Sequence, residues 1–265
     1  MDMDLKNRKV VVTGAGDGIG RSLALAFGEA GARVAGCARN SDKLHAVEKE
    51  IDGAGHLFAT ADCSKSDDIQ QFHDKVIPAL GGVDILINNV GSVQKLAGFF
   101  DLSDGDWQEV FDVNLMSAVR ACRLFVPTLK NSVAPRIINI TSVAASRPGD
   151  VFPHYSAMKA GLCNLTVSLA RALADDKILV NSVSPGPVWS KSWEDEARQA
   201  ASQTGGDVEK IAEGMRSSTG ETLLLKRMGV PDDVTGLVLF LASDLSRWIT
   251  ASNFTVDGGF TQNPY

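Results

Sequence analysis

Tyr155 and Lys159 carry the side chains of this sequence that are best suited to acid–base chemistry, and Ser142 lies thirteen residues before Tyr155. In a helix, a spacing of four places a phenol and an ammonium on one face, one above the other. A free phenol has a pKa near ~10, so it is a poor acid–base catalyst at neutral pH. A lysine charge roughly 5 Å away, at an effective dielectric of about 20, would stabilise the phenolate by about 3 kcal/mol and lower its pKa by roughly two units. The spacing alone is more typical of a helix with one partly buried Tyr and a solvated Lys.

Short apolar runs alternate with longer helical patterns along the whole chain. The runs VVVT, DILIN, RIINI and ILVNSV are apolar almost throughout, which is typical of a parallel sheet covered on both faces. Seven strands with helical crossovers predict an α/β fold with a doubly wound parallel sheet, and no linker divides residues 1–265 into two domains. The expected strands are Lys9–Thr13, Arg33–Ala38, His56–Ala61, Val83–Asn88, Arg136–Thr141, Ile178–Ser184 and Asn253–Val256. The expected helices are Gly18–Ala30, Ser41–Asp52, Ser66–Leu80, Asp104–Leu129, His154–Asp176 and Pro231–Ala242, with a capping box at Ser103 and Asp106.

The composition is that of an ordinary globular protein, with 44% hydrophobic and 22% charged residues. A net charge of −6 argues against nucleic acid or an anionic membrane as a partner. No apolar run approaches the ~20 residues of a membrane span. The start of the chain, MDMDLKNRK, passes straight into an apolar strand without the hydrophobic region of a signal peptide, so we expect a cytoplasmic protein.

The cysteines and histidines show no metal-ligand spacing. Cys37, Cys122 and Cys163 lie in apolar segments, where small core residues are a better interpretation than disulfides or metal ligands. We therefore predict no bound metal.

One polar segment, residues 190–222, departs from the regular pattern. It contains seven acidic and four basic residues and follows the strand-ending turn Ser184-Pro185-Gly186-Pro187. A segment at the carboxyl end of a strand can cover a pocket, which predicts a substrate-covering element over residues 187–226. A pair of solvated surface helices is an equally good interpretation.

A glycine-rich turn joins the first expected strand to the first helix. The spacing G-x-x-x-G-x-G falls on Gly14, Gly18 and Gly20, with Asp17 and Ile19 between them. Such glycines allow a tight turn and a close backbone approach, and the helix N-terminus receives a pyrophosphate. The position of the turn at the first strand predicts a dinucleotide site.

The end of the second strand favours NADP(H). A carboxylate there binds the ribose hydroxyls of NAD, whereas an arginine accepts the 2′-phosphate of NADP. The sequence reads Cys37-Ala38-Arg39-Asn40, so the carboxylate is missing and Arg39 follows directly. Asp17 in the glycine loop weakens this argument slightly, and NAD(H) stays an alternative.

The ordered set of motifs resembles the short-chain dehydrogenase/reductase family, in its compact single-domain branch that includes 3-oxoacyl-acyl-carrier-protein reductases. The resemblance covers essentially the whole chain. It implies a Rossmann-type fold, a nicotinamide cofactor and a homotetramer or homodimer. The motifs that carry it are the glycine loop, Asn88-Asn89-Val90-Gly91, Asn114, Ser142, Tyr155, Lys159, Pro185-Gly186, Arg227-x-Gly229-x-Pro231, Phe240-Leu241-Ala242-Ser243 and Val256-Asp257-Gly258-Gly259.

The resemblance also implies a role for individual residues. Tyr155 would be the general acid in carbonyl reduction and the base in alcohol oxidation, with Ser142 bonded to the substrate oxygen. Lys159 would hold the nicotinamide ribose and lower the Tyr155 pKa, and Asn114 would position a water in a proton relay. The further cofactor-binding residues are Asp62 and Cys63 near the adenine, Asn89 and Gly91 beside the adenosine, Pro185 and Gly186 in their motif, and Val188 and Ser190 at the carboxamide.

The resemblance implies hydride transfer between the cofactor and a ketone or secondary alcohol. Relatives that act on 3-oxoacyl carrier proteins present arginines where this chain has Val133 and Asp176, so a free small ketone, or a CoA ester, is favoured over an acidic carrier protein. A non-catalytic nucleotide sensor would not need Ser142, Tyr155 and Lys159 together, and an α/β-hydrolase would need a G-x-S-x-G motif that the chain lacks. Candidates for the pocket wall are Val93, Val143, Phe152, His154, Trp189 and Trp193.

Overall fold

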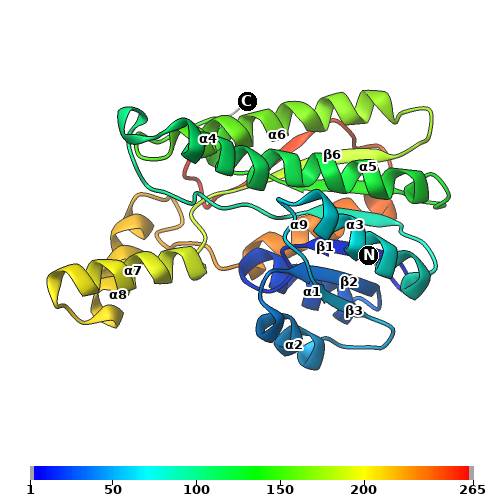
Figure 1. Cartoon of the computed structure of the whole chain (residues 1–265), viewed down its shortest axis with the longest axis horizontal. Coiled ribbons are helices and arrows are strands. Elements are labelled where there is room, and N and C mark those ends of the chain that lie inside the picture. The colour runs from blue at the N-terminus through cyan, green and yellow to red at the C-terminus, as the bar shows by residue number, and fades with distance from the viewer. Residues whose placement is uncertain (1–2, 263–265) are drawn as a thin grey trace.

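A seven-stranded parallel sheet forms the centre of the molecule (Figure 1). The structure is a computed structural model and describes residues 3–262. The strands lie in the order β3-β2-β1-β4-β5-β6-β7, so the chain winds outward in one direction from β1 and then in the other from β4. This is the doubly wound, Rossmann-type sheet expected from the apolar strands. The strands are β1 (Lys9–Thr13), β2 (Arg33–Ala38), β3 (Leu57–Thr60), β4 (Ile85–Asn88), β5 (Arg136–Ile140), β6 (Leu179–Pro185) and β7 (Asn253–Val256).

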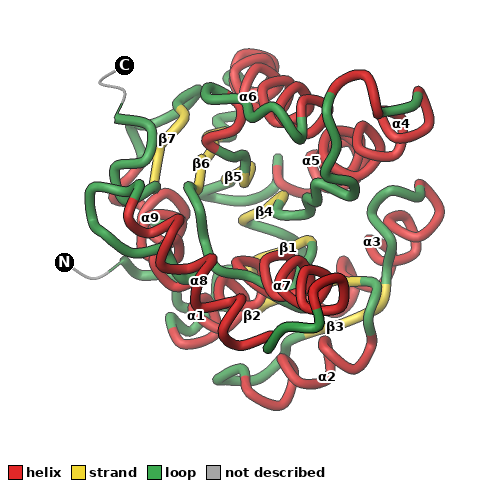
Figure 2. Tube along the Cα trace, turned by 90° about the vertical axis from the view of Figure 1, so that its left-hand side faces the viewer, coloured by secondary structure: helices red, strands yellow, loops and turns green. Residues whose placement is uncertain are grey.

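Helices cover both faces of this sheet (Figure 2). Helices α1 (Gly18–Glu29), α2 (Ser41–Glu50) and α9 (Asp232–Ala242) bury their apolar sides against one face. Helices α3 (Ser66–Leu80), α5 (Ser117–Leu129) and α6 (Pro153–Ala172) cover the other face. Among residues 3–262, no helix is long and apolar enough to cross a membrane.

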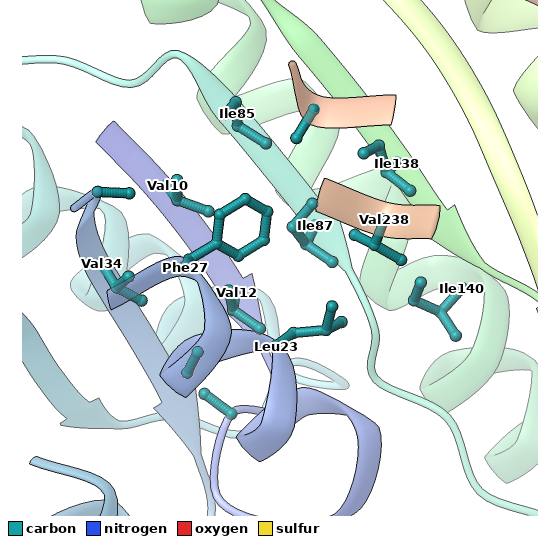
Figure 3. Close-up of a cluster of buried hydrophobic side chains, with 14 of the residues drawn as sticks. Val10, Val12, Leu23, Phe27, Val34, Ile85, Ile87, Ile138, Ile140 and Val238 are labelled. Atoms are coloured by element: carbon teal, nitrogen blue, oxygen red, sulfur yellow. The ribbon is translucent and has the colours of Figure 1, made fainter. Parts of the chain in front are cut away.

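Two hydrophobic cores follow from the alternation of side chains along each strand. Val10 and Val12 of β1 point into the core beneath α1 and α9, where Phe27 and Val238 meet them (Figure 3). Val11, between them, points into the opposite core. Burial on both faces explains why the strands are apolar at almost every position.

The helix expected over residues 104–129 is interrupted. Helix α4 (Asp104–Phe111) begins with the predicted capping box at Ser103 and Asp106, and a π-helical turn (Asp112–Met116) separates it from α5. The backbone N–H of Ser117 therefore donates to the carbonyl of Asp112, five residues back. The extra residue places Asn114 in the middle of the turn, and such turns are frequent at functional sites.

The other boundaries differ little from the expected ones. Strands β3 and β4 are shorter than predicted, and α6 ends at Ala172 instead of Asp176. The polar segment forms two helices, α7 (Lys191–Thr204) and α8 (Val208–Glu221), which project from the body of the sheet at the left of Figure 1.

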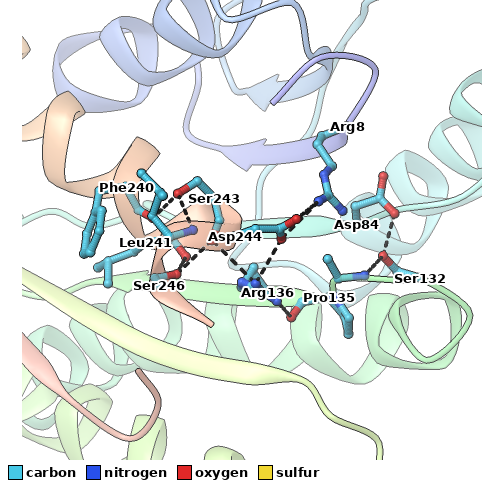
Figure 4. Close-up of polar contacts among 12 residues, drawn as sticks. Arg8, Asp84, Ser132, Pro135, Arg136, Phe240, Leu241, Ser243, Asp244 and Ser246 are labelled. Atoms are coloured by element: carbon cyan, nitrogen blue, oxygen red, sulfur yellow. Dashed lines mark hydrogen bonds and ion pairs between the residues drawn. The ribbon is translucent and has the colours of Figure 1, made fainter. Parts of the chain in front are cut away.

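The amino ends of the strands together form one side of the sheet, called the amino edge below, and it carries a network of polar side chains (Figure 4). Arg136, the first residue of β5, has a side chain only 5% exposed and lies 3.5 Å from the carboxylate of Asp244. Arg8 lies 3.1 Å from the same carboxylate. The guanidinium of Arg136 also donates to the carbonyl of Pro135 at 3.1 Å. These bonds connect the beginning of β5 with the segment that follows α9.

Candidate active site

A cavity of about 880 Å³ lies along the carboxyl ends of the strands and brings the predicted site residues together. It extends across the point between β1 and β4 where the winding reverses, which is the usual ligand position in open α/β sheets. All predicted site residues except Asn114 line it. They are Gly14, Asp17, Gly18, Ile19, Gly20, Arg39, Asp62, Cys63, Asn89, Gly91, Ser142, Tyr155, Lys159, Pro185, Gly186, Val188 and Ser190.

The glycine loop leaves no room for side chains at its centre. A Cβ atom on Gly20 would lie 2.1 Å from the carbonyl oxygen of Gly14 and 2.4 Å from Nδ2 of Asn89. Gly14 and Gly18 have positive φ angles of 71° and 52°, which other residues rarely adopt. The loop therefore presents bare backbone to the cavity at the N-terminus of α1, as a pyrophosphate site requires.

Two cations lie at the end of β2. Arg39 lines the cavity, and so does Lys43, which forms an ion pair with Asp17 of the glycine loop. Asn40 caps α2 by accepting a hydrogen bond from the backbone N–H of Lys43 at 3.0 Å, which fixes Lys43 in the first turn. The sequence analysis did not identify Lys43 as a site residue. The signal that could have found it is Asn40, a typical helix N-cap, which places Lys43 in the first helical turn next to the end of β2.

Asp62 and Cys63 lie beyond β3 at the same end of the cavity. Burial raises the Asp62 pKa, but hydrogen bonds from Ser64 and the nearby charges of Arg39 and Lys65 outweigh it, so the net pKa is lowered and the carboxylate is charged. The sulfur of Cys63 lies 3.6 Å from that of Cys37. This contact and burial raise the pKa of the Cys63 thiol well above its usual value.

The remaining cysteines have different environments. Cys37 and Cys122 are buried as expected, whereas Cys163 is only half-buried. Within residues 3–262, no group of three or more His, Cys, Asp or Glu side chains could hold a metal ion.

Tyr155 and Lys159 lie in the first two turns of α6. The Nζ atom of Lys159 lies 5.7 Å from the centre of the Tyr155 ring and donates a hydrogen bond to the carbonyl of Ile140 at 3.0 Å. Burial lowers the pKa of Lys159 to about 8. Burial also raises the pKa of Tyr155, and a hydrogen bond with Ser142 only partly opposes that rise.

The expectation that Lys159 lowers the Tyr155 pKa is therefore wrong for these side chains by themselves. The sequence argument counted the charge of Lys159 and left out the removal of water from both groups. In the structure burial sets the direction of the Tyr155 pKa, and the effect that opposes it is the hydrogen bond with Ser142.

Asn114 lies behind the cavity wall and does not line it. It is fully buried; its Oδ1 accepts from the N–H of Ser92 at 3.0 Å, and its Nδ2 donates to the carbonyl of Ser92 at 2.8 Å. A Cβ on Gly91 would lie 3.0 Å from this Oδ1 and 2.6 Å from Nζ of Lys159. The side chain of Asn114 thus holds the turn after β4 tightly against Lys159.

The predicted pocket wall is partly wrong. Val93, Val143, Phe152 and Trp193 line the cavity, whereas His154 and Trp189 do not. The imidazole of His154 is fully buried against Trp107, with ring centres 6.0 Å apart. Trp189 stacks on Trp193, and the guanidinium of Arg216 lies 4.2 Å from its ring centre.

Several cavity residues could not be found by motif. Arg147 and Pro148 come from the segment that follows Ser142, and Phe260 comes from the last described turn of the chain. The helices α7 and α8 contribute Lys191, Ser192, Trp193, Asp195 and Thr219. Nothing in their local sequence marks these positions, because only the tertiary fold brings them to one cavity.

The cavity has the features that a nicotinamide dinucleotide needs. Backbone with no space for a Cβ lies at the N-terminus of α1, a charged carboxylate and two cations lie at the ends of β2 and β3, and a buried lysine lies beside a tyrosine. Taken together, the fold and this site define a dinucleotide-binding oxidoreductase.

Comparison with known proteins agrees. A family model described as enoyl-(acyl carrier protein) reductase matches residues 14–261. A short-chain type dehydrogenase/reductase of Sinorhizobium fredii, itself uncharacterized, is 34% identical over 264 residues, covering 97% of this chain and 98% of the relative. The 3-oxoacyl-[acyl-carrier-protein] reductase of Staphylococcus epidermidis is 34% identical over 258 residues, covering 96% and 98%.

A solved structure is similar over the same length. L-sorbose reductase from Gluconobacter frateurii, complexed with NADPH and L-sorbose, superposes with a TM-score of 0.90 at 29% identity, covering 99% of this chain and all of the other. The chain belongs to the short-chain dehydrogenase/reductase family, whose members are NAD(P)(H)-dependent oxidoreductases that act on CH–OH groups.

Proposed function

We propose that this protein transfers a hydride between NADP(H) and a small ketone or secondary alcohol. The observation that carries the proposal is that Ser142, Tyr155 and Lys159 line the same cavity as the glycine loop. A nucleotide sensor would have no use for a hydroxyl pair beside a buried lysine at that point. The bound cofactor would supply the hydride at the substrate carbon.

The chain's own residues would manage the oxygen of the substrate. In reduction, the hydroxyls of Ser142 and Tyr155 donate hydrogen bonds to the carbonyl oxygen, and Tyr155 gives up its proton as charge develops there. Lys159, held by the carbonyl of Ile140, places a positive charge near the tyrosinate that results. Asn114 is a positioning residue in this scheme, since it acts through the turn at Gly91 and Ser92.

NADP(H) is favoured over NAD(H) by the charges at the end of β2. No carboxylate stands directly after that strand, where Arg39 follows Ala38, and Arg39 and Lys43 both line the cavity there. Lys43 neutralises Asp17, which removes the repulsion that Asp17 would exert on a 2′-phosphate. Arg39 can then bind the phosphate through charge-assisted hydrogen bonds, which are of the strong kind.

Residues 187–226 would cover the substrate in a single domain of residues 1–265. Helices α7 and α8 contribute five residues to the cavity wall, and Trp193 brings a large aromatic face to it. A free small molecule fits this arrangement better than an acidic carrier protein. Val133 is 95% exposed, and Asp176 forms an ion pair with Lys130, so neither position offers a cation to a carrier.

Cofactor titration followed by turnover tests the proposal. We expect NADPH to quench tryptophan fluorescence at lower concentration than NADH, and Arg39→Gln to reduce that difference about tenfold or more. We expect Tyr155→Phe to bind NADPH as well as the natural chain and to lose about 100- to 10,000-fold in turnover, followed at 340 nm on a panel of ketones. Tighter binding of NADH, or unchanged turnover of Tyr155→Phe, would contradict the respective part. A 3-oxoacyl carrier protein or CoA ester as the best substrate would favour the 3-oxoacyl reductase alternative.

A further inference from the structure

The short turn that begins at Ser142 also holds an arginine at the cavity. The 3₁₀ turn Val143–Ala145 follows Ser142, whose Oγ accepts a hydrogen bond from the N–H of Ala144 at 3.1 Å. The carbonyl of Val143 then accepts from the N–H of Arg147 at 2.8 Å. One hydrogen-bonded unit therefore fixes the backbone of both Ser142 and Arg147, and both residues line the cavity.

The guanidinium of Arg147 is held in place without an acidic partner. It lies 4.5 Å from the ring centre of Phe260 and donates from Nη1 to the carbonyl of the same residue. Among residues 3–262, no ion pair or second hydrogen bond is formed by this guanidinium, and four of its five N–H groups stay free to donate. Stacking on Phe260 restricts the side chain, so less rotational freedom is lost when it binds a ligand.

The other cations of the cavity either have a bonded partner or lie at its cofactor end. Lys43 forms an ion pair with Asp17, and Lys191 forms one with Asp195. Lys159 is bonded to the carbonyl of Ile140, and Arg39 lies at the cofactor end near Asp62. At the end where Ser142, Phe152 and Trp193 lie, Arg147 is the free cation of the described cavity wall.

The cavity as a whole is positive in an acidic protein. Its wall holds five basic residues (Arg39, Lys43, Arg147, Lys159 and Lys191) and three acidic ones (Asp17, Asp62 and Asp195), whereas the chain carries a net charge of −6. Such a cavity concentrates anions against the sign of the whole molecule. The phosphates of a dinucleotide would account for the charge at Arg39, and they leave the charge at Arg147 unexplained.

We propose that Arg147 binds an oxyanion, a carboxylate or a phosphate, on the substrate and so selects acidic ketones or alcohols over neutral ones. This inference rests on the proposed function and names the substrate class of that site. The carbonyl of such a substrate lies at Ser142 and Tyr155, and its acidic group lies at the guanidinium, five residues along the same turn. A planar guanidinium with free paired donors suits both oxyanions, because each can accept two parallel bonds.

Matched substrate pairs test the proposal. A 3-oxo acid is compared with its methyl ester, and a keto-sugar phosphate with the free keto-sugar, so the two arms distinguish carboxylate from phosphate. We expect one acidic member to be reduced at least about tenfold more efficiently than its neutral counterpart. We expect Arg147→Gln to lower kcat/KM for that acidic substrate about 10- to 100-fold, mainly through KM, and to change the neutral one little. Arg147→Lys should recover part of the loss, since it keeps the charge and loses the paired geometry.

Arg198→Gln is the control for a loss of charge outside the cavity. Arg198 is an exposed residue of α7 that forms an ion pair with Glu194 and does not line the cavity. We expect it to behave like the natural chain on every substrate. Equal loss in both variants, or no difference between acidic and neutral substrates in the natural chain, overturns the role of Arg147.

Failure of the proposed function has a different result. If the natural chain neither binds NADPH nor reduces any member of the panel, the oxidoreductase assignment of this cavity fails along with the substrate class. If NADPH binds and the acidic ketones, like the neutral ones, are reduced equally by the natural chain and Arg147→Gln, the proposed function stands and only the role of Arg147 is rejected.

Discussion

A cation is buried at the amino ends of the strands and another at their carboxyl ends, and the two have opposite electrostatic surroundings. At the amino edge, Arg136 lies within 3.5 Å of Asp244, and the attraction of that carboxylate opposes the lowering of its pKa by burial. At the carboxyl edge, Lys159 is 2% exposed and has a backbone carbonyl as its partner. Its pKa falls to about 8 because no carboxylate compensates for the loss of water.

This difference separates charges that have an acidic partner from a buried charge that has none. The amino edge is closed by Arg8, Arg136 and Asp244, and its charges bind one another. The carboxyl edge keeps an uncompensated charge beside an open cavity, which destabilises the folded chain until a ligand arrives. Three substitutions test whether this separation holds, and a fourth provides a control.

The largest expected effect is the loss of activity in Lys159→Met. Methionine fills a similar volume and removes the charge that would face the tyrosinate. We expect ketone reduction to fall about 100-fold or more, measured as NADPH consumption at 340 nm with the cofactor at saturation. Turnover within a few-fold of the natural chain would mean that the buried charge has no part in the chemistry.

The same variant should be more stable than the natural chain at neutral pH. The folded pKa of Lys159 is about 8, against 10.5 for the free side chain, so between these values the unfolded chain binds more protons and the stability of the natural protein rises with pH. Below pH 8 the buried charge is present in full, and we expect Lys159→Met to gain about 1–3 kcal/mol there after the lost hydrogen bond to Ile140 is subtracted. The gain should shrink toward pH 10.5 in urea unfolding; a gain that does not vary with pH would contradict this origin.

Gly20→Ala should damage the glycine loop. The new Cβ would lie 2.1 Å from the carbonyl oxygen of Gly14, so the loop backbone must move. We expect NADPH affinity to fall about 10- to 100-fold in fluorescence titration. Gly236→Ala is the control, since Gly236 is also helical and nothing lies within 4 Å of its Cβ position; it should keep full affinity and gain about 0.5–1 kcal/mol of stability.

The smallest effect is expected at the amino edge. Arg136→Met removes a hydrogen bond to Pro135 and the contact with Asp244, whose carboxylate is 61% exposed and can be hydrated instead. We expect a loss of about 1–2 kcal/mol in the free energy of unfolding and no change in kcat/KM. A loss of activity at equal stability would show that the two edges are coupled and would remove the distinction drawn between them.

The fold and the cofactor end of the site could be predicted from the sequence because local patterns specify them. Continuous apolar runs such as Val10–Val12 predict covered parallel strands, and the spacing of Gly14, Gly18 and Gly20 predicts the phosphate-binding turn. In the structure the run lies in β1 and the three glycines line the cavity, whereas phosphate binding by the turn stays a prediction. The capping box at Ser103 and Asp106 is a further local signal that the structure confirms.

The substrate end depends on contacts that no local pattern records. Phe260 reaches Arg147 across more than a hundred residues of chain, and the π turn arises inside a segment whose sequence reads as one continuous helix. The error on the Tyr155 pKa has the same origin. The direction of the Tyr155 pKa shift depends on burial by distant elements, whereas the sequence showed only the neighbouring lysine.

The positive cavity in a negative chain has a consequence for the rate at which an anionic ligand is captured. At about 0.01 M salt the screening length is about 30 Å, so an approaching dinucleotide experiences the repulsion of the whole molecule. At about 0.1 M salt that length is about 10 Å, and only the attraction near the mouth remains. The association rate of NADPH should therefore rise with the first additions of salt and fall again when the cavity itself is screened.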